Sequence, residues 1–522
     1  MFEADLALRE GLERELAGWA VDRVRDCGAV AGSAEAQEHG RRAERNAPRL
    51  RTHDRYSRRV DRVEYDPSWQ WLLRGAVERG IHALPWREPR AGAHVARVAL
   101  EFLWTQANAG VMCPISLTFS AVPALCADAV LAAEWEPRLT LPDLARGALC
   151  GMAMTEKQGG SDVRAGTSRA VPAGAGCFEL TGHKWFCSHP MCNVFLVLAQ
   201  APAGLSCFVV ERGAGFEIQR LKDKLGTRSL ASAEIELRGA QGRLLGDEGR
   251  GVATIIEMVT HTRLDCIAGS ASGMRRGVAE AVHHARHRSA FGARLAQQPL
   301  MLNVLADLAV EAEAATASAL RLARAYDEDD KPLRRFGTAV MKYWICKRAT
   351  PHAAEALECL GGNGYVEESP LPQLLRDAPL NGIWEGSGKR DLARRPARAG
   401  ARTGGTARLP GRVRAGAWGR PAAGRAPRCA AGAARGPGRR GPPVAGASRR
   451  RGAVARVPWL AAGSPRAAGG RRRVLRRSAG RRARPRVRHA AARDRRRSDS
   501  RARAGHLNPA GPAGATLGFH PA

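Results

Sequence analysis

The sequence lacks the features that mark a membrane protein or a disulfide-rich secreted protein. No apolar run reaches the ~18 residues that a membrane-spanning helix needs. The N-terminal stretch MFEADLALREGLERE is acidic and amphipathic, unlike a secretory signal. The 12 cysteines include no C-x-x-C pair and no metal-ligand spacing, which is typical of a chain in a reducing compartment. These absences predict a cytoplasmic protein without a bound metal.

Acidic residues are scarce only at the end of the chain. The chain has 83 Lys and Arg, of which 36 lie in residues 389–522, and 50 Asp and Glu, of which only 3 lie there. Residues 1–388 therefore contain 47 basic and 47 acidic residues. The terminal stretch also lacks Ile and Tyr and is dominated by Arg, Ala, Gly and Pro. Such a composition buries too little apolar surface to offset chain entropy. We therefore predict a disordered basic tail over 389–522 behind an electrically neutral body.

The body predicts an α+β fold of three parts arranged around one site. Residues 1–150 have helical spacing, as in Val95–Leu103, and residues 249–388 return to it in Leu300–Tyr326 and Gly337–Leu360. The basic stretch Arg41–Arg62 is predicted to be a solvated connection. Residues 151–248 contain short runs typical of antiparallel strands in a barrel or sandwich: Phe178–Thr181, Val194–Leu198, Leu205–Val210 and Ala233–Leu237.

Two segments of the strand region carry side chains suited to a planar polar ligand. Met152–Val163 reads M-A-M-T-E-K-Q-G-G-S-D-V, where a Thr, two glycines and a Ser bring hydroxyls and backbone N–H groups together. Thr181–Ser188 reads T-G-H-K-W-F-C-S, where a Trp can stack on an aromatic ring while the Ser hydroxyl reaches a ring heteroatom. Alone, the first is equally explained as a Gly-rich turn and the second as a strand with a core Trp.

Two segments of the second helical region are suited to a phosphate-containing ligand. Arg288–Pro299, R-S-A-F-G-A-R-L-A-Q-Q-P, offers a guanidinium whose planar fork makes two parallel bonds to pyrophosphate. Leu360–Tyr365, L-G-G-N-G-Y, follows a helix and lets a second backbone approach a cofactor. The alternatives are a surface Arg near a helix start and a plain helix C-cap.

The candidate base is Glu385, in the segment Ile383–Gly388 that reads I-W-E-G-S-G. A Trp- and Gly-lined turn partly desolvates the carboxylate, so its pKa is expected to rise toward the range of a general base. The alternative is an exposed loop glutamate.

In this order and spacing, the five segments resemble the acyl-CoA dehydrogenase family over residues 6–388. M-T-E-K-Q-G-G-S-D is similar to the family's flavin-binding T-E-x-x-x-G-S-D segment, K-W-F-C-S to its flavin strand, R-x-x-F-G to its cofactor clamp, L-G-G-N-G-Y to its Gly-Gly loop and W-E-G-S-G to its catalytic E-G-T/S. L-K-D-K-L-G-T-R-S at Leu221–Ser229, with Q-Q-P-L-M and I-W-E-G-S-G, resembles the AidB-type branch of the DNA alkylation response.

The resemblance implies an FAD-dependent oxidoreductase with an N-terminal helical domain (1–150), a flavin-binding β-domain (151–248) and a truncated C-terminal helical domain (249–388). Glu385 is the implied base, which removes the α-proton of an acyl-CoA while the β-hydrogen leaves as hydride to flavin N5. Arg263 is the implied substrate-binding residue. The implied FAD-binding residues are Met154, Thr155, Gly160, Ser161, Trp185, Phe186, Ser188, Arg288, Phe291, Gln298, Gly361, Gly362, Trp384 and Gly386.

The implied partners are an acyl-CoA, an electron acceptor and further copies of the chain in a dimer or tetramer. Arg288, Gln298 and the Gly361-Gly362 loop would hold the adenine end of FAD, partly across an interface between copies. A second function stays open, in which the chain is a flavin-containing, DNA-associated protein of the alkylation response with little dehydrogenase activity.

The residues after Gly388 depart from the family, which continues with Asn and an apolar helix. Lys389–Pro396 instead reads K-R-D-L-A-R-R-P. One permitted set of codons, with one base removed from the first, encodes N-V-I-W-L-D-V, which is the expected helix. The hypothesis is a one-base frameshift near codon 389, so that DNA binding by the tail would be non-specific neutralisation of phosphate charge.

Overall fold

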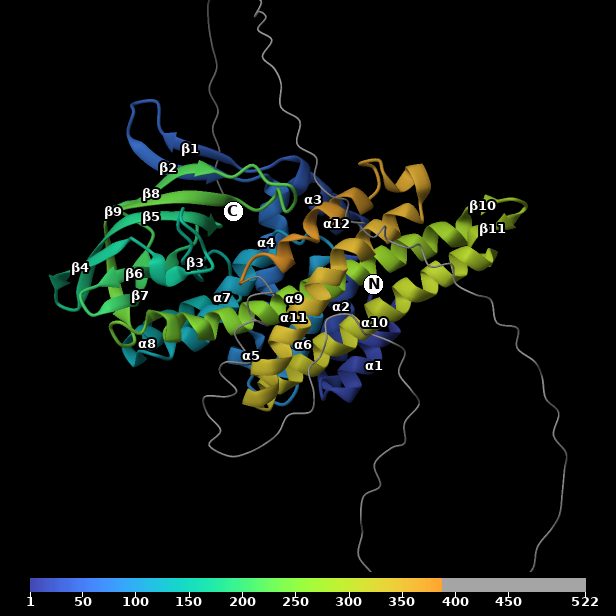
Figure 1. Ribbon diagram of the computed structural model, residues 1–522, viewed down its shortest axis with the longest axis horizontal. Helices are drawn as coiled ribbons and strands as arrows, with labels where there is room; N and C mark the ends of the chain where they lie inside the picture. The colour runs from blue at the N-terminus through green and yellow to red at the C-terminus, as the bar shows by residue number, and fades with distance from the viewer. Residues whose placement is uncertain (387–522) are drawn as a thin grey trace, which may run out of the picture. The chain divides into compact units, whose positions relative to one another are not determined.

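The computed structural model describes residues 1–386, which belong to one unit (Figure 1). Helices, then strands, then helices follow one another along the chain, and this order confirms the predicted α+β class. The predicted domain limits at 150 and 248 fall at the first strand of the middle sheet, Cys150–Ala153, and just before the helix Gly251–His287. The predicted tail, its frameshift origin and positions 387 and 388 lie outside the described residues.

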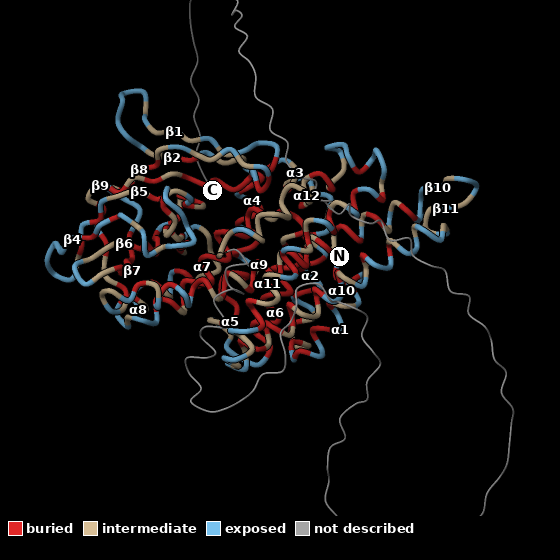
Figure 2. The backbone as a smooth tube through the Cα atoms, viewed as in Figure 1, coloured by how far each residue is buried: buried red, intermediate tan, exposed pale blue. Residues whose placement is uncertain are grey.

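The helices before the sheet form one packed group whose innermost member is α6. Every residue of α6 from Ala93 to Trp104 is buried, because its apolar side chains surround the whole helix rather than one stripe (Figure 2). Caps fix where others begin, as where the Asp66 carboxylate accepts from the Ser68 N–H ahead of α4. The helices are α1 Leu6–Arg14, α2 Val21–Ala31, α3 Ala34–Arg45, α4 Pro67–Glu78, α5 Leu84–Arg87, α6 Ala93–Thr105, α7 Met112–Leu125 and α8 Ala129–Leu139.

The prediction that Arg41–Arg62 is a connection was wrong. The last turn of α3 is followed by an antiparallel hairpin of β1 (Arg49–His53) and β2 (Arg59–Glu64), which projects beside β8 in Figure 1. Leu50 lies opposite Val63 on the face that packs inward, while Arg51 lies opposite Arg62 on the outer face. Two inward apolar side chains are enough to dock a strand pair, but they leave too weak an alternation for the sequence to show it.

The middle of the chain is a β-barrel. The pairings β6–β4, β4–β5, β5–β9, β9–β7 and β7–β6 close a ring, with β3 added beside β6 and β8 beside β9. The four predicted strands lie inside β5, β6, β9 and β7, but β3 and β4 pair with β6 in parallel, so the sheet is not purely antiparallel. The strands are β3 Cys150–Ala153, β4 Arg169–Gly174, β5 Cys177–Ser188, β6 Val194–Ala201, β7 Gly204–Glu211, β8 Phe216–Leu221 and β9 Ser232–Leu245.

The C-terminal helices build the wall behind the site. α9 (Gly251–His287) is 37 residues long and packs against α7, α10 (Pro299–Asp327) and α11 (Lys331–Glu358). A short hairpin of β10 (Ser289–Ala290) and β11 (Ala293–Arg294) joins α9 to α10, and α12 (Leu371–Asp377) packs on α11. In residues 1–386, no helix has the length and apolar character to cross a bilayer.

Candidate active site

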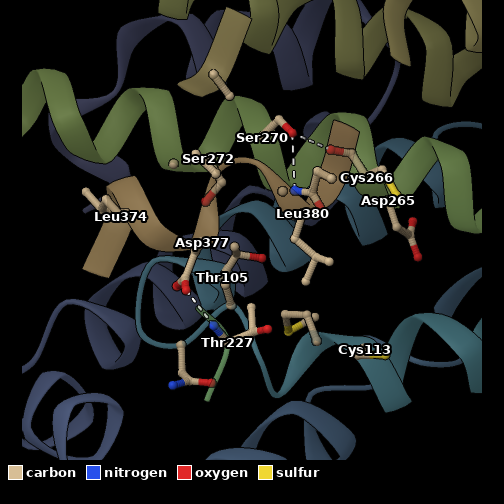
Figure 3. Close-up of a pocket in the computed structure, with 18 of the residues that line it drawn as sticks. Thr105, Cys113, Thr227, Asp265, Cys266, Ser270, Ser272, Leu374, Asp377 and Leu380 are labelled. Carbon is tan, nitrogen blue, oxygen red and sulfur yellow. Dashed lines mark hydrogen bonds between the residues drawn. The ribbon is translucent and has the colours of Figure 1, made fainter. Parts of the chain in front are cut away.

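A cavity lies among α6, α7, α9, α11 and the segment from α12 to Glu385 (Figure 3). The α9 side of the cavity is lined by Thr262, Asp265, Cys266, Gly269, Ser270, Ser272, Gly273, Met274 and Arg276. All but Met274 recur at three- and four-residue spacing, so they share one face of the helix. From Thr262 to Arg276 that face extends for about 20 Å at 1.5 Å per residue, which makes the cavity elongated.

Glu385 lies in the cavity wall, where three contacts fix its turn. The Thr262 hydroxyl donates to Oε2 of Glu385 at 2.7 Å, and Arg263 Nε donates to the Glu385 carbonyl at 2.8 Å. Lys342 Nζ donates to the carbonyls of Asn381, Trp384 and Gly386 at 2.9–3.0 Å. Glu385 has φ +59°, a left-handed conformation that is uncommon for a side chain of this size. The contacts therefore hold a strained turn that aims the carboxylate at the cavity.

Burial raises the pKa of Glu385, and the Thr262 hydrogen bond, Arg263 and Lys342 oppose that rise only in part. The predicted rise in pKa is thus confirmed in direction. Trp384 and Gly386, which were expected to bind the cofactor, flank the carboxylate in this turn, and Trp384 Nε1 donates to Asn381 Oδ1 at 2.9 Å. Arg263, expected to bind substrate, contacts the backbone of the base, so the structure gives it a positioning contact.

A buried charge cluster lies behind the base. Arg97 of α6 is fully buried and donates to both carboxylate oxygens of Asp265, with NH2 2.9 Å from Oδ2. Its NH1 also lies 2.8 Å from Oε2 of Glu101. Burial raises the pKa of Glu101 well above its ordinary value, and Asp265 adds to the effect. The cluster therefore favours the protonated form of Glu101, and both Glu101 and Asp265 also line the cavity.

The residues predicted to face a flavin ring gather at one edge of the barrel. Met154 and Thr155 follow β3 and lie beside the end of β5, where the Trp185 N–H donates to the Thr155 carbonyl at 2.9 Å. Gly160 folds back onto Thr155, since a Cβ added to it would lie 2.8 Å from the Thr155 hydroxyl. Ser161 is exposed beside it. These residues from two segments are therefore neighbours in space.

β5 also carries Phe186, which is 52% exposed, and Ser188. Ser188 connects this edge to the cavity, because it lies beside cavity-lining Cys113, whose pKa burial raises to about 12. Lys222, which the sequence did not single out, lies 3.2 Å from the centre of the Trp185 ring and pairs with Glu234 at 2.7 Å. One face of the indole is therefore covered by an ammonium group.

The residues predicted to hold the adenine end lie elsewhere. Arg288 and Phe291 lie at the exposed β10–β11 hairpin, which Figure 1 shows at the opposite end of the unit from β3 and β5. Gln298 starts α10 and donates to the Ala290 carbonyl at 3.1 Å. Gly361 and Gly362 are exposed after α11. One copy of the chain does not bring these residues to the flavin-facing edge.

A second carboxyl faces the other end of the cavity. Oδ1 of Asp377, at the end of α12, accepts the Thr227 N–H at 2.6 Å, while Glu44 of α3 accepts the next two N–H groups, from Arg228 and Ser229 (Figure 3). Side chains of α12 and α3 thus accept hydrogen bonds from the same loop, which joins β8 to β9. Burial and the nearby Glu44 raise the pKa of Asp377 from 3.8 to about 7.

We expect Asp377 to make the protein less stable as pH rises from about 4 to 7. In that range the unfolded chain has released this proton and the folded chain keeps it, so the folded state loses up to about 4 kcal/mol relative to the unfolded state. Asp377→Asn does not titrate and still accepts from Thr227. Urea denaturation at pH 5 and pH 8 should therefore show a smaller pH effect in Asp377→Asn than in the wild type, and an unchanged effect in exposed Asp26→Asn. Equal pH effects in all three proteins would contradict this assignment.

Sequence reasoning missed the residues that reach the site from far along the chain. Thr262, Lys342 and Asp265 are 123, 43 and 120 positions from Glu385 and contact its turn or line its cavity only after folding. Lys342 did leave a signal, because it stands on the buried face of α11 with Ala339, Ile345 and Cys346. A lysine at a core position of a helix needs acceptors, and here it has three carbonyls.

Comparison with known proteins gives a consistent result for each part of the chain. Residues 1–145 match the family "Adaptive response protein AidB N-terminal domain", 151–240 match "Acyl-CoA dehydrogenase, middle domain" and 249–397 match "Acyl-CoA dehydrogenase, C-terminal domain". The putative acyl-CoA dehydrogenase AidB of Escherichia coli is 45% identical over 409 residues, which cover 74% of this chain and 76% of that protein. Acyl-CoA dehydrogenase family member 11 of Caenorhabditis elegans is 34% identical over 68% of this chain and 63% of its own length. The crystal structure of Caenorhabditis elegans ACDH-11 in complex with C11-CoA superposes with a TM-score of 0.72 at 31% identity, covering 75% of this chain and 73% of that one.

Proposed function

The chain belongs to the acyl-CoA dehydrogenase family, in its AidB branch, and on that premise we propose that it oxidises an acyl-CoA with Glu385 as the base. The observation that supports this most is the carboxylate of Glu385, which lines an elongated cavity with its pKa raised by burial. A general base is most effective when its pKa lies near the working pH. The strained turn costs folding energy and is held by contacts from α9 and α11.

The residues of this chain would each contribute one physical effect. The ionised carboxylate of Glu385 accepts the α-proton of the thioester and holds it. The Thr262 hydroxyl fixes the direction of that carboxylate, and Arg263 and Lys342 fix the backbone that carries it. The cavity wall excludes water, which strengthens the charge interactions within it. FAD, when bound, supplies the acceptor for the hydride that leaves the β-carbon.

The residues present fit FAD, which the family binds. Thr155, Ser161 and Ser188 bring hydroxyl groups to one edge of the barrel, next to the half-exposed Trp185. At Gly361 and Gly362 an added Cβ would meet nothing within 4 Å, so this backbone is open to a close approach. Arg288 lies at the far end of the unit from this edge. A second copy of the chain would therefore have to supply Arg288, Gln298 and the Gly361-Gly362 loop to the adenine end of FAD, which supports a homo-oligomer.

The test is to purify the full chain and measure its FAD content and its absorbance during anaerobic titration with acyl-CoA. Isovaleryl-CoA and C11-CoA are suitable probes, one short and branched and one long. We expect a yellow protein whose flavin absorbance is bleached by at least one of them. A colourless protein, or a yellow one that no acyl-CoA bleaches, would contradict the dehydrogenase proposal.

The β1–β2 hairpin favours the second candidate function, a DNA-associated protein. The hairpin, residues 49–64, contains six arginines and three acidic residues. All three acids are engaged within the hairpin, since Asp54 caps its turn, Asp61 pairs with Arg59 and Glu64 lies 3.2 Å from Arg51. Arg51 also stands directly opposite Arg62, so one Glu64 carboxylate serves a stretch of two facing arginines. A projecting two-stranded ribbon of this charge has the dimensions of the DNA major groove.

We expect the double variant Arg51→Ala and Arg62→Ala to weaken binding of duplex DNA and to flatten its dependence on salt. Each lost phosphate contact should lower the slope of log K against log salt by about 1. The measurement is fluorescence anisotropy at several salt concentrations, with residues 389–522 deleted so that the tail does not contribute. Arg321→Ala on α10 is the control. Equal slopes in all variants would exclude the hairpin as a DNA-binding surface.

A further inference from the structure

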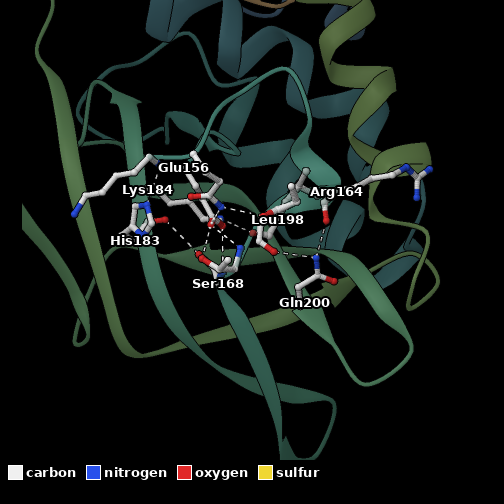
Figure 4. Close-up of polar contacts among 12 residues, drawn as sticks. Glu156, Arg164, Ser168, His183, Lys184, Leu198 and Gln200 are labelled. Atoms are coloured by element: carbon white, nitrogen blue, oxygen red, sulfur yellow. Dashed lines mark hydrogen bonds and ion pairs between the residues drawn. The ribbon is translucent and has the colours of Figure 1, made fainter.

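A buried ion pair inside the barrel joins the two segments that were predicted to face the flavin (Figure 4). Lys184 Nζ lies 2.8 Å from Oε1 of Glu156, and the two side chains are 1% and 2% exposed. Neither residue was among those predicted to act at the site. Glu156 directly follows Thr155, and Lys184 directly precedes Trp185.

Several donors are directed at Glu156. Glu156 accepts from the N–H and hydroxyl of Thr167 at 2.6 and 3.1 Å, from the Ser168 N–H at 3.2 Å and from Gln158 Nε2 at 2.9 Å. Lys184 donates a second bond to the Leu198 carbonyl at 2.6 Å. Burial favours the neutral forms and lowers the pKa of Lys184, but Lys184 and these hydrogen bonds hold the pKa of Glu156 below its ordinary range. The carboxylate form of Glu156 is therefore favoured in this pair.

Fold stability alone does not account for such a pair. Desolvation of two charges offsets most of their attraction, and apolar replacements of equal volume are often as stable. The pair instead fixes geometry. Glu156 binds residues 167 and 168 at the far end of its own loop, so it closes the loop that carries Gly160 and Ser161.

Strand β5 transmits this constraint to the site. β5 has a register irregularity between Lys184 and Cys187, two residues that are both buried. The two residues between them, Trp185 and Phe186, are half-buried and exposed, so anchoring Lys184 in the barrel fixes where this irregular stretch begins. The Trp185 N–H in turn donates to the Thr155 carbonyl at 2.9 Å, which ties the two segments together by their backbones as well. Thr155 and Trp185 are thus both held by the Glu156–Lys184 pair, which is buried next to them in the barrel.

We propose that Glu156 and Lys184 are positioning residues for the flavin, which set the relative placement of Thr155, the Gly160-Ser161 loop and Trp185. This inference rests on the proposed flavin-dependent function. The pair touches no reacting atom, and its effect passes through the residues beside it. Loss of both charges together should therefore weaken FAD binding more than it lowers the stability of the barrel.

The test compares Glu156→Gln, Lys184→Met and the double variant, with Glu311→Gln and Arg348→Met as a control ion pair on α10 and α11. Two quantities test the site, the Kd for FAD and amide hydrogen exchange in the FAD-free protein, and the thermal unfolding midpoint of each variant is measured beside them. The single variants should raise Kd at least tenfold and speed exchange at Thr167, Ser168 and Trp185. The double variant should regain thermal stability, because no unpaired charge is left, but not FAD affinity.

A double variant that binds FAD like the wild type would overturn the inference, as would unchanged exchange in the single variants. The control pair should change neither quantity. If the wild type binds no FAD, the proposed function falls, and the exchange rates alone then show whether the pair holds the loop. The two failures are therefore distinguishable.

Discussion

Replacing Glu385 with glutamine should slow the bleaching of the flavin by an acyl-CoA at least ~100-fold, the lower end of what a positioned general base contributes. Glutamine fills the same volume and still accepts from Thr262, so the turn and FAD binding should persist. What is lost is the proton acceptor. The measurement is stopped-flow absorbance under anaerobic conditions, at saturating acyl-CoA, with Glu368→Gln as the exposed control.

The pH profile gives an independent check on the same residue. Because the pKa of Glu385 is raised, a larger share of the carboxylate is protonated and inactive at low pH. The bleaching rate of the wild type should rise with pH and level off above that pKa, whereas the residual rate of Glu385→Gln should not show this step. Rapid bleaching in Glu385→Gln would assign the base to another residue.

The sequence predicted those parts of the site whose residues are close together along the chain, and not those that helix packing brings together. Thr155 and Gly160, or Trp384 and Glu385, lie close in sequence, and short segments of this kind carry their geometry with them. The raised pKa of Glu385 was predictable because Trp384 and Gly386 adjoin it. Its orientation was not, because Thr262 and Lys342 come from α9 and α11, whose rotation about their axes is fixed only when they pack.

The fold shows the same division. The long helices and the four barrel strands were predicted because their apolar periods are strong, whereas the β1–β2 hairpin has only Leu50 and Val63 on its inner face. The Glu156–Lys184 pair was not predicted, although both residues stand inside the quoted motifs. Only the hydroxyl groups and aromatic rings of those motifs were expected to act at the site. In a strand, the neighbour of a ligand-facing side chain points into the core, and a charge there demands a partner.

The largest effect on stability is expected from Arg97→Met, at about 3–5 kcal/mol, the usual cost of removing one partner from a buried ion pair. Arg97 makes bonds to Asp265, Glu101 and the Ile81 carbonyl, and these residues are at most 5% exposed, so the substitution removes a donor that little solvent can replace. The stranded carboxylate can be neutralised only by taking up a proton. Urea denaturation should therefore show a greater loss of stability at pH 8 than at pH 5.

Glu101→Gln separates this account from a simple loss of packing. Burial raises the pKa of Glu101 and so favours its protonated form, which an amide of the same size mimics while still donating to Asp265. We expect it to cost less than about 1 kcal/mol, the ordinary net value of one hydrogen bond. A cost near that of Arg97→Met would mean that Glu101 is ionised and that the cluster carries a net negative charge. That charge would face the cavity beside Glu385, where it would oppose ionisation of the base, so the two denaturation curves also test the electrostatics proposed for Glu385.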